Sequence, residues 1–512
     1  MNPVHEKHLQ PARVALIAGA VALAYRVVLS RVYWGQEEGD YGNLGLILGT
    51  VESGFSYVET EHMPMYTWLS AAVCAVVGDA HLAGLLVSLV FGTATVALVT
   101  WGASRWLGLT TGIVLGLVLA FQPDLALLSA TTLRGPTYTG LLAACVLAAA
   151  SRRWLLAGLL FWPAFLTRFD AMATVLPLLA LGAALDRATP KVRRVAGIGI
   201  AAAVVPAWAA LYWRLEGTAR FWAGAVGRNT GTTSDLSLAA RLGKGLEALV
   251  DVGRYMLPDH VGAALLALAP VGVVVLLRGA ARDPNRGRMA GLLAATTGGF
   301  FATTVVLSAY RWDHNLYWSW LGVAAPFVLP AAVHGGVALV RALPRGRALA
   351  AVALAAATLL PFYRQTWQQV LRSEQWLGTQ VRFTRWLDRE LPPDAVILAD
   401  LIPATWLGRT SGARTVLRWS QEDVPEGDPA ALGAWLADHD VGAVIWFREE
   451  WVGAAERAPW LGEPGRLVAG PVVLEAVAKE DGYGFVGWLV TEGEAPPRPP
   501  LAAGRWPRRE AP

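Results

Sequence analysis

Apolar runs long enough to cross a lipid bilayer recur along most of this 512-residue chain, and they constrain its fold more than any other feature. A helix needs roughly twenty apolar residues to span the hydrocarbon core, and such runs follow one another from Ala12 to Leu360. Hydrophobic residues make up 54% of the chain and charged residues only 16%, which excludes an ordinary soluble protein. We predict a polytopic α-helical membrane protein with about eleven transmembrane helices.

The charged turns between the runs predict an orientation, because Lys and Arg are enriched on the cytoplasmic side of membranes. If the N-terminus is cytoplasmic, every second turn is basic, as at 186–194, 278–288 and 341–347. The acidic segment 31–81 then forms a first outer loop, and 214–258 forms a second long one. The first run is too long for the apolar region of a typical signal peptide, so we expect an uncleaved first span in the inner or plasma membrane.

After Pro361 the composition becomes that of a soluble protein, which predicts three regions. These are a transmembrane domain at 1–362, a small extracytoplasmic α/β domain at 363–495, and a Pro-rich disordered tail at 496–512. Within the α/β domain we expect helices at PATWLGR and DPAALGAWLADHD, buried strands in LPPDAVILAD and VGAVIWF, and two closing strands in RLVAGPVVLEAVA and GYGFVGWLV. The 23 tryptophans of the chain are first interpreted as anchors at the membrane interface.

Three carboxylates gather just after the first apolar run, in the segment WGQEEGDY. A carboxylate of Glu37, Glu38 or Asp40 at the edge of a low-dielectric region could act as a general base toward a hydroxyl. Neighbouring carboxylates could also bind a divalent cation, so Mg²⁺ or Mn²⁺ is a candidate cofactor, although no particular ligand set is indicated. The alternative is the solvated start of a loop. The flanking aromatic residue Tyr41 favours a site that binds a substrate.

Histidine and arginine side chains at other span ends fall on the same predicted outer side of the membrane. The candidates for substrate binding are His62, Arg134, Arg168, Arg311 and His314. Guanidinium groups bind phosphate oxygens bidentately, so converging arginines would suit an anionic lipid headgroup. Each residue also has a plainer interpretation: histidines are common at membrane interfaces, arginines extend to the interface from span ends, and the acids beside Arg168 and Arg311 would pair with them locally.

Several other classes of protein are excluded. Cys74 and Cys145 lie alone in apolar runs, so neither a disulfide framework nor a cysteine metal site is available. The excess of 43 basic over 39 acidic residues is too small for a nucleic-acid-binding protein. The chain has no Walker, HExxH or GxSxG motif, and its one dinucleotide-like match, GIGIAA, lies inside a predicted span.

In their order along the chain, these motifs resemble the GT-C class of polytopic glycosyltransferases, particularly the branch of protein O-mannosyltransferases and aminoarabinose transferases. EEGDY at 37–41 is similar to the acidic motif that follows the first span in that branch, and EHMPMYTWL at 61–69 to its His-Pro-Pro segment. FLTRFDA at 165–171 resembles its Leu-Thr-Lys or Leu-Thr-Arg turn, and 311–330 resembles a late span with a preceding basic residue. The resemblance covers the whole chain.

The chain also departs from the family pattern. Glu37 stands in place of the leading Asp of the acidic pair, and Met63 replaces one proline of the His-Pro-Pro segment. Arg134 lies in a turn where relatives often carry an acid. The identity of the base among Glu37, Glu38 and Asp40 therefore stays open.

The resemblance implies an inverting glycosyltransferase that takes a sugar from a polyprenyl phosphate-linked donor. The acceptor would be a lipid, glycan or protein at the outer face of the membrane. One acid of the cluster would be the base, and Arg168 or Arg311 would stabilise the departing phosphate. A transporter or flippase for a lipid-linked saccharide, and a non-catalytic relative of the family, are the alternatives.

Overall fold

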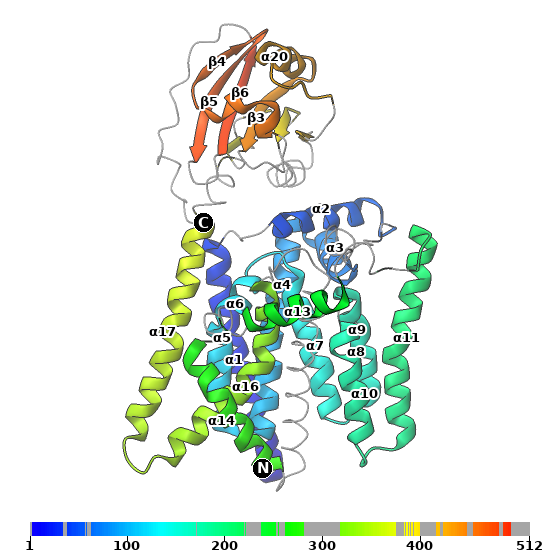
Figure 1. Ribbon diagram of the computed structural model, residues 1–512, viewed down its shortest axis with the longest axis vertical. Coiled ribbons are helices and arrows are strands. Elements are labelled where there is room, and N and C mark those ends of the chain that lie inside the picture. The colour runs from blue at the N-terminus through cyan, green and yellow to red at the C-terminus, as the bar shows by residue number, and fades with distance from the viewer. Residues whose placement is uncertain are drawn as a thin grey trace. The chain divides into compact units, whose positions relative to one another are not determined.

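The computed structural model describes the greater part of the chain (Figure 1). The described ranges are 3–33, 38–56, 63–169, 171–219, 237–251, 262–280, 318–374, 394–399, 416–419, 423–447, 454–480 and 485–492, with isolated positions between them. The chain divides into two compact units. The first holds Met1–Arg31, Ser53–Val73 and Ala83–Gln368, and the second holds Val32–Glu52, Cys74–Leu82 and Gln369–Pro512.

The first unit is built from helices, and Figure 1 shows the long ones side by side with α13 lying across them. The helices that lie wholly or mostly in this unit are α1 (Pro3–Val32), α3 (Met65–Val77), α4 (Ala80–Trp106), α5 (Leu109–Phe121), α6 (Pro123–Ser129), α7 (Arg134–Ala150), α8 (Trp154–Thr167), α9 (Ala171–Thr174), α10 (Leu176–Leu185), α11 (Lys191–Glu216), α13 (Leu238–Asp251), α14 (Ala263–Ala280), α16 (Trp318–Ala342) and α17 (Arg347–Ser373).

Within the described ranges, five helices are long and apolar enough to cross a membrane, in α1, α4, α11, α16 and α17. Helices α5 and α6 pass the same criterion together, but the chain bends by 58° between them. The chain is therefore a polytopic helical membrane protein, as predicted. The count of about eleven spans stays a prediction, because α8 and α14 are shorter and the expected span at 289–308 lies outside the described residues.

Two glycines allow α8 and α11 to pack closely. A Cβ atom at Gly158 would overlap the carbonyl oxygen of Gly197, and a Cβ atom at Gly197 would overlap the carbonyl oxygen of Trp154. Helices in membranes associate through small residues that let their backbones approach, because lipid tails provide no hydrophobic driving force between helices. This contact fixes the position of α8 in the bundle.

We expect Gly197→Ala to destabilise the protein by about 1–3 kcal/mol, because the added methyl group meets backbone atoms that cannot move without separating the helices. The matched control is Gly199→Ala on the same helix, where a Cβ atom meets nothing within 4 Å. Thermal unfolding in detergent measures both variants. Equal unfolding temperatures for the two would contradict the close packing of α8 against α11.

The second unit contains a six-stranded sheet with the strand order β2-β1-β3-β6-β5-β4. Its strands are β1 (Val396–Ala399), β2 (Val416–Arg418), β3 (Val441–Phe447), β4 (Arg466–Ala469), β5 (Val472–Glu480) and β6 (Phe485–Glu492). Strand β1 pairs in parallel with β2 and β3, whereas β3, β6, β5 and β4 pair antiparallel in succession. The unit also holds helices α2 (Glu38–Glu52), α20 (Pro429–Asp438) and α21 (Ala454–Arg457), and the 3₁₀ helix η5 (Pro459–Gly462).

Tryptophan side chains form much of the core of this sheet. Trp419, Trp446 and Trp488 are buried, and their indole N–H groups donate to the carbonyl oxygens of Ile445 (2.8 Å), Ala454 (3.1 Å) and Leu461 (3.1 Å) respectively. A buried indole is stable where its N–H finds an acceptor. The interpretation of the tryptophans as interface anchors is therefore wrong for these three.

The strand predictions in LPPDAVILAD and VGAVIWF are confirmed by β1 and β3, and the helix predicted in DPAALGAWLADHD by α20. The single strand expected in RLVAGPVVLEAVA is instead β4 and β5, because the chain turns at Gly470, whose φ of +56° suits glycine. Strand β2 was not predicted, and the expected helix PATWLGR lies outside the described residues. The division into 1–362, 363–495 and 496–512 stays a prediction.

Candidate anion-binding site

The structure describes the side chains of only some predicted site residues. Arg134 and Arg168 are fully described, whereas Glu37, His62, Arg311 and His314 lie outside the described residues. Glu38, Asp40 and Tyr41 have a described backbone only, at the start of α2.

The acidic cluster begins a helix, where the sequence had indicated a loop. Glu38 is the first residue of α2, and Asp40 lies in its first turn. Carboxylates are favourable there because the N-terminus of a helix carries a partial positive charge. The helix is fixed by an apolar side that includes Leu44 and Ile47, both buried. Helix α2 belongs to the second unit and the two arginines to the first, so their proposed cooperation stays a prediction.

One predicted arginine, Arg168, lies over the ring of Tyr138, and a second, Arg134, lies one helical turn before that tyrosine. The guanidinium carbon of Arg168 lies 5.7 Å from the centroid of the Tyr138 ring, in the range of a cation–π contact. Arg134 begins α7 four residues before Tyr138, and residues four apart are neighbours on one helix face. Tyr138 is completely buried, so it gives the guanidinium of Arg168 a fixed aromatic surface.

The local structure explains why these arginines lie at helix ends. The carbonyl oxygen of Leu133, which precedes α7 in an extended conformation, accepts a hydrogen bond from Ser88 Oγ on α4 (2.9 Å). Helix α8 ends at Thr167, whose hydroxyl donates back to the Pro163 carbonyl oxygen (2.7 Å). Arg168 is then extended, with a φ of −152° and a ψ of 121°. The helix therefore ends at 167, where the sequence placed the end of a span, and whether α8 crosses the membrane stays a prediction.

The surroundings of the two arginines are buried and partly polar. Thr137, between Arg134 and Tyr138, is fully buried, and its hydroxyl has no hydrogen-bond partner in the part of the chain that is described. On the side of Arg168, Phe165 packs edge-on against Phe221 with ring centroids 5.9 Å apart. Guanidinium groups at the edge of such a region bind phosphate oxygens strongly, because water competes little there.

Sequence reasoning missed a set of buried polar residues at the break between α5 and α6. Gln122 Nε2 donates to Asp124 Oδ2 (2.8 Å), and Gln122 Oε1 accepts from the backbone N–H of Leu125 (2.6 Å). Asp124 is only 3% exposed. The available signal was a polar residue followed by proline, which is typical of a helix start, within an apolar run. Arg26 on α1 was also missed.

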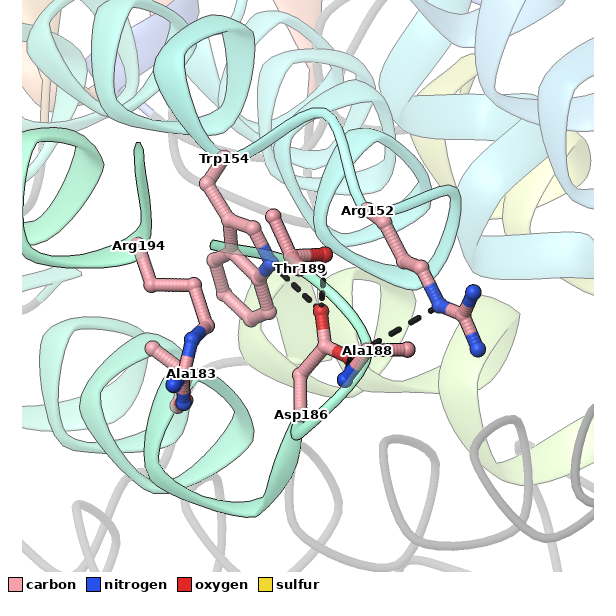
Figure 2. A network of polar contacts seen from close by, with 7 residues as sticks. All are labelled: Arg152, Trp154, Ala183, Asp186, Ala188, Thr189 and Arg194. Atoms are coloured by element: carbon pink, nitrogen blue, oxygen red, sulfur yellow. Dashed lines mark hydrogen bonds and ion pairs between the residues drawn. The ribbon is translucent and has the colours of Figure 1, made fainter. Parts of the chain in front are cut away.

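A different polar network joins two turns of the first unit (Figure 2). The buried carboxylate of Asp186 accepts hydrogen bonds from Trp154 Nε1 (2.9 Å), Thr189 Oγ1 (2.5 Å) and the Ala188 N–H (3.1 Å). Arg152 Nε lies 3.7 Å from the same carboxylate. The network ties the start of α8 to the turn between α10 and α11, at the opposite end of α8 from Arg168.

We expect Asp186→Ala to destabilise the protein by about 3 kcal/mol, because it leaves the buried Trp154 and Thr189 donors without an acceptor. Asp186→Asn is the matched control, since its amide oxygen still accepts one hydrogen bond. The partly exposed ion pair to Arg152 contributes little. Thermal unfolding in detergent measures both, and an unchanged unfolding temperature for Asp186→Ala would contradict the role of the network.

The described residues hold no group of three or more His, Cys, Asp and Glu side chains that could bind a metal ion. The side chains of Glu37, Glu38 and Asp40 are not among those described. The divalent cation suggested by the sequence therefore stays a prediction.

The helices of the first unit and the mixed sheet of the second define the class of the chain as a polytopic membrane protein with the fold of ArnT. The chain is similar to the crystal structure of ArnT from Cupriavidus metallidurans bound to undecaprenyl phosphate, with a TM-score of 0.59 and 16% identity over 94% of this chain and 99% of that one. It matches the apo structure of the same protein with a TM-score of 0.57 and 15% identity, over 92% and 97% of the two chains.

A weaker match, with a TM-score of 0.41 and 13% identity, is the arabinofuranosyltransferase AftD from mycobacteria, where 93% of this chain corresponds to 41% of the larger one. No family model and no curated protein sequence matches the chain. The likeness to ArnT confirms the fold that the sequence motifs led us to expect.

Proposed function

We propose that the protein is an inverting glycosyltransferase that moves a sugar from a polyprenyl phosphate-linked donor to a lipid, glycan or protein acceptor. The observation that carries the proposal is the guanidinium of Arg168 over the buried Tyr138, with Arg134 one helical turn before that tyrosine at the start of α7. An anionic headgroup is what such a pair recognises. The fold adds support, since the ArnT structure of the same fold holds undecaprenyl phosphate.

In the proposed reaction, one carboxylate of Glu37, Glu38 or Asp40 removes the proton from the acceptor hydroxyl. The hydroxyl oxygen attacks the anomeric carbon from the face opposite the phosphate, forming the new glycosidic bond with inversion. The bond between the anomeric carbon and the phosphate oxygen breaks, and its electron pair leaves with the phosphate. Arg168 and Arg134 stabilise the charge that develops on that oxygen.

The remaining predicted residues have proposed roles in the same site. Tyr41 would contact the sugar, and His62, Arg311 and His314 would contact the phosphate or the acceptor. If Mg²⁺ or Mn²⁺ takes part, the acids of the cluster would hold it. We place the N-terminus in the cytoplasm and the C-terminal domain outside, because the turns alternate in basic charge in that register. The site then lies at the outer face of the membrane.

The experiment that tests this function incubates the purified protein with a panel of polyprenyl phosphate-linked sugars and candidate acceptors. Mass spectrometry follows the donor and the free polyprenyl phosphate. We expect one donor to be consumed with release of an equal amount of carrier. A panel in which every donor stays intact, although undecaprenyl phosphate binds, would favour the transporter or the non-catalytic relative.

A further inference from the structure

Arg26 on α1 is a charged side chain that the proposed reaction does not use. It lies about 9 Å before the end of its helix, at six residues and 1.5 Å per residue, and its side chain is 0% exposed. Within the described ranges, its Nε and Nη2 atoms have no hydrogen-bond partner. A buried cation in a membrane span is expensive, and an apolar side chain of similar volume would be cheaper. Stability alone therefore does not explain Arg26.

The Nη1 atom of Arg26 is paired at the break between α5 and α6. Arg26 Nη1 donates to the carbonyl oxygen of Ala120 (3.2 Å), in the last turn of α5, and to that of Ala22 (3.1 Å) in its own helix. Pro123, the first residue of α6, has no N–H to donate, and the chain bends by 58° there. A cation is favourable beside the carbonyl oxygens that end a helix. Arg26 therefore holds the bent connection from the α1 side.

Helix α4 contacts the same connection at two points that are one helical turn apart on α4. A Cβ atom at Gly92 would overlap the hydroxyl of Ser129, the last residue of α6, and would lie 3.6 Å from Arg26 Nε. Four residues earlier, Ser88 Oγ donates to the carbonyl oxygen of Leu133 (2.9 Å). Leu133 directly precedes Arg134. The segment from Ala120 to Leu133 is thus held by α1 at its start and by α4 at its end, and Arg134 is the residue that follows it.

We propose that Arg26 is a positioning residue for the candidate anion site: together with Ser88 it fixes the α5–α6–α7 connection, and so sets the place of Arg134, one helical turn before the tyrosine that Arg168 covers. This inference rests on the proposed function. The guanidinium of Arg26 does not touch the ligand. It acts through the backbone of the connection, which carries its effect to the first residue of α7.

The test measures the Kd of undecaprenyl phosphate and the thermal unfolding temperature of the full-length protein in detergent. Arg26→Met fills the same space without donors, and we expect it to weaken binding about tenfold, as a small misplacement of a binding group does. Its unfolding temperature should not fall, because an apolar side chain replaces a poorly paired cation. Ser88→Ala should weaken binding in the same way. Ser30→Ala is the control, since Ser30 on α1 donates to its own helix, at Val27.

A double-mutant cycle separates positioning from a general loss of structure. In the background of Arg134→Gln, neither Arg26→Met nor Ser88→Ala should weaken binding further. Additive losses, an unchanged Kd for Arg26→Met, or a lower unfolding temperature for that variant would overturn the inference while leaving the proposed function in place. Failure of the wild-type protein to bind undecaprenyl phosphate would overturn both.

Discussion

Arg168→Gln will lower the rate of sugar transfer by about 10²–10³-fold, the loss that follows removal of one preorganised donor to a developing negative charge. The reason is geometric. Arg168 is held in an extended conformation at the end of α8, with its guanidinium over the buried Tyr138 ring. Glutamine keeps hydrogen-bonding groups but has neither the charge nor the fork that binds phosphate bidentately. We expect the transfer rate to fall and the Kd of undecaprenyl phosphate to rise.

Arg152→Gln is the matched control, because Arg152 is another partly exposed arginine at the opposite end of α8. We expect that variant to keep its transfer rate. Arg168 lies at a helix end, so we also expect Arg168→Gln to unfold at the temperature of the wild type. Removing one such donor lowers a rate by at least about a hundredfold. A transfer rate within about threefold of the wild type would therefore show that Arg168 is not part of the site.

The second large effect concerns the acidic cluster of Glu37, Glu38 and Asp40. We expect Glu37→Gln, Glu38→Gln or Asp40→Asn to lower the transfer rate by about 10²–10⁴-fold, the range of general base catalysis. The amide cannot accept the proton of the acceptor hydroxyl, whereas its size is unchanged. Binding of undecaprenyl phosphate should persist, since the base acts on the acceptor rather than on the carrier.

Single-turnover kinetics with a bound donor separates these steps, because it reports chemistry without product release. The variant that loses transfer identifies the base. Glu52→Gln, at the other end of α2, is the control and should retain the rate. Full activity in all three acid variants would contradict a base in this cluster.

Much of the fold could be predicted from the sequence, because repeated apolar runs of membrane-spanning length are compatible with few folds. The end of α8 at Thr167 and strand β3 at Val441–Phe447 lie where the sequence placed them. The break at Pro123 was missed, since the surrounding run is apolar enough to hide it. The helix that begins at Glu38 was also missed, because its glycines are typical of a loop.

The candidate site was predicted only in part. The sequence named Arg134 and Arg168, but it could not show that Arg168 lies over the ring of Tyr138, because that contact joins α7 to the residue that follows α8. Arg26 was invisible as a positioning residue, since its partner Ala120 is 94 residues away and contributes only a carbonyl oxygen. Every residue carries a backbone carbonyl oxygen, so a contact to one leaves no pattern in the amino-acid sequence.

The central claim is that this fold carries out transfer and does not merely move a lipid. The most direct measurement places the protein in sealed vesicles with a polyprenyl phosphate-linked sugar labelled in the sugar, and follows free carrier and labelled acceptor together by mass spectrometry. Our account predicts that carrier and labelled product appear in equal amounts, and that Arg168→Gln suppresses both. An intact donor that only changes its leaflet would contradict it.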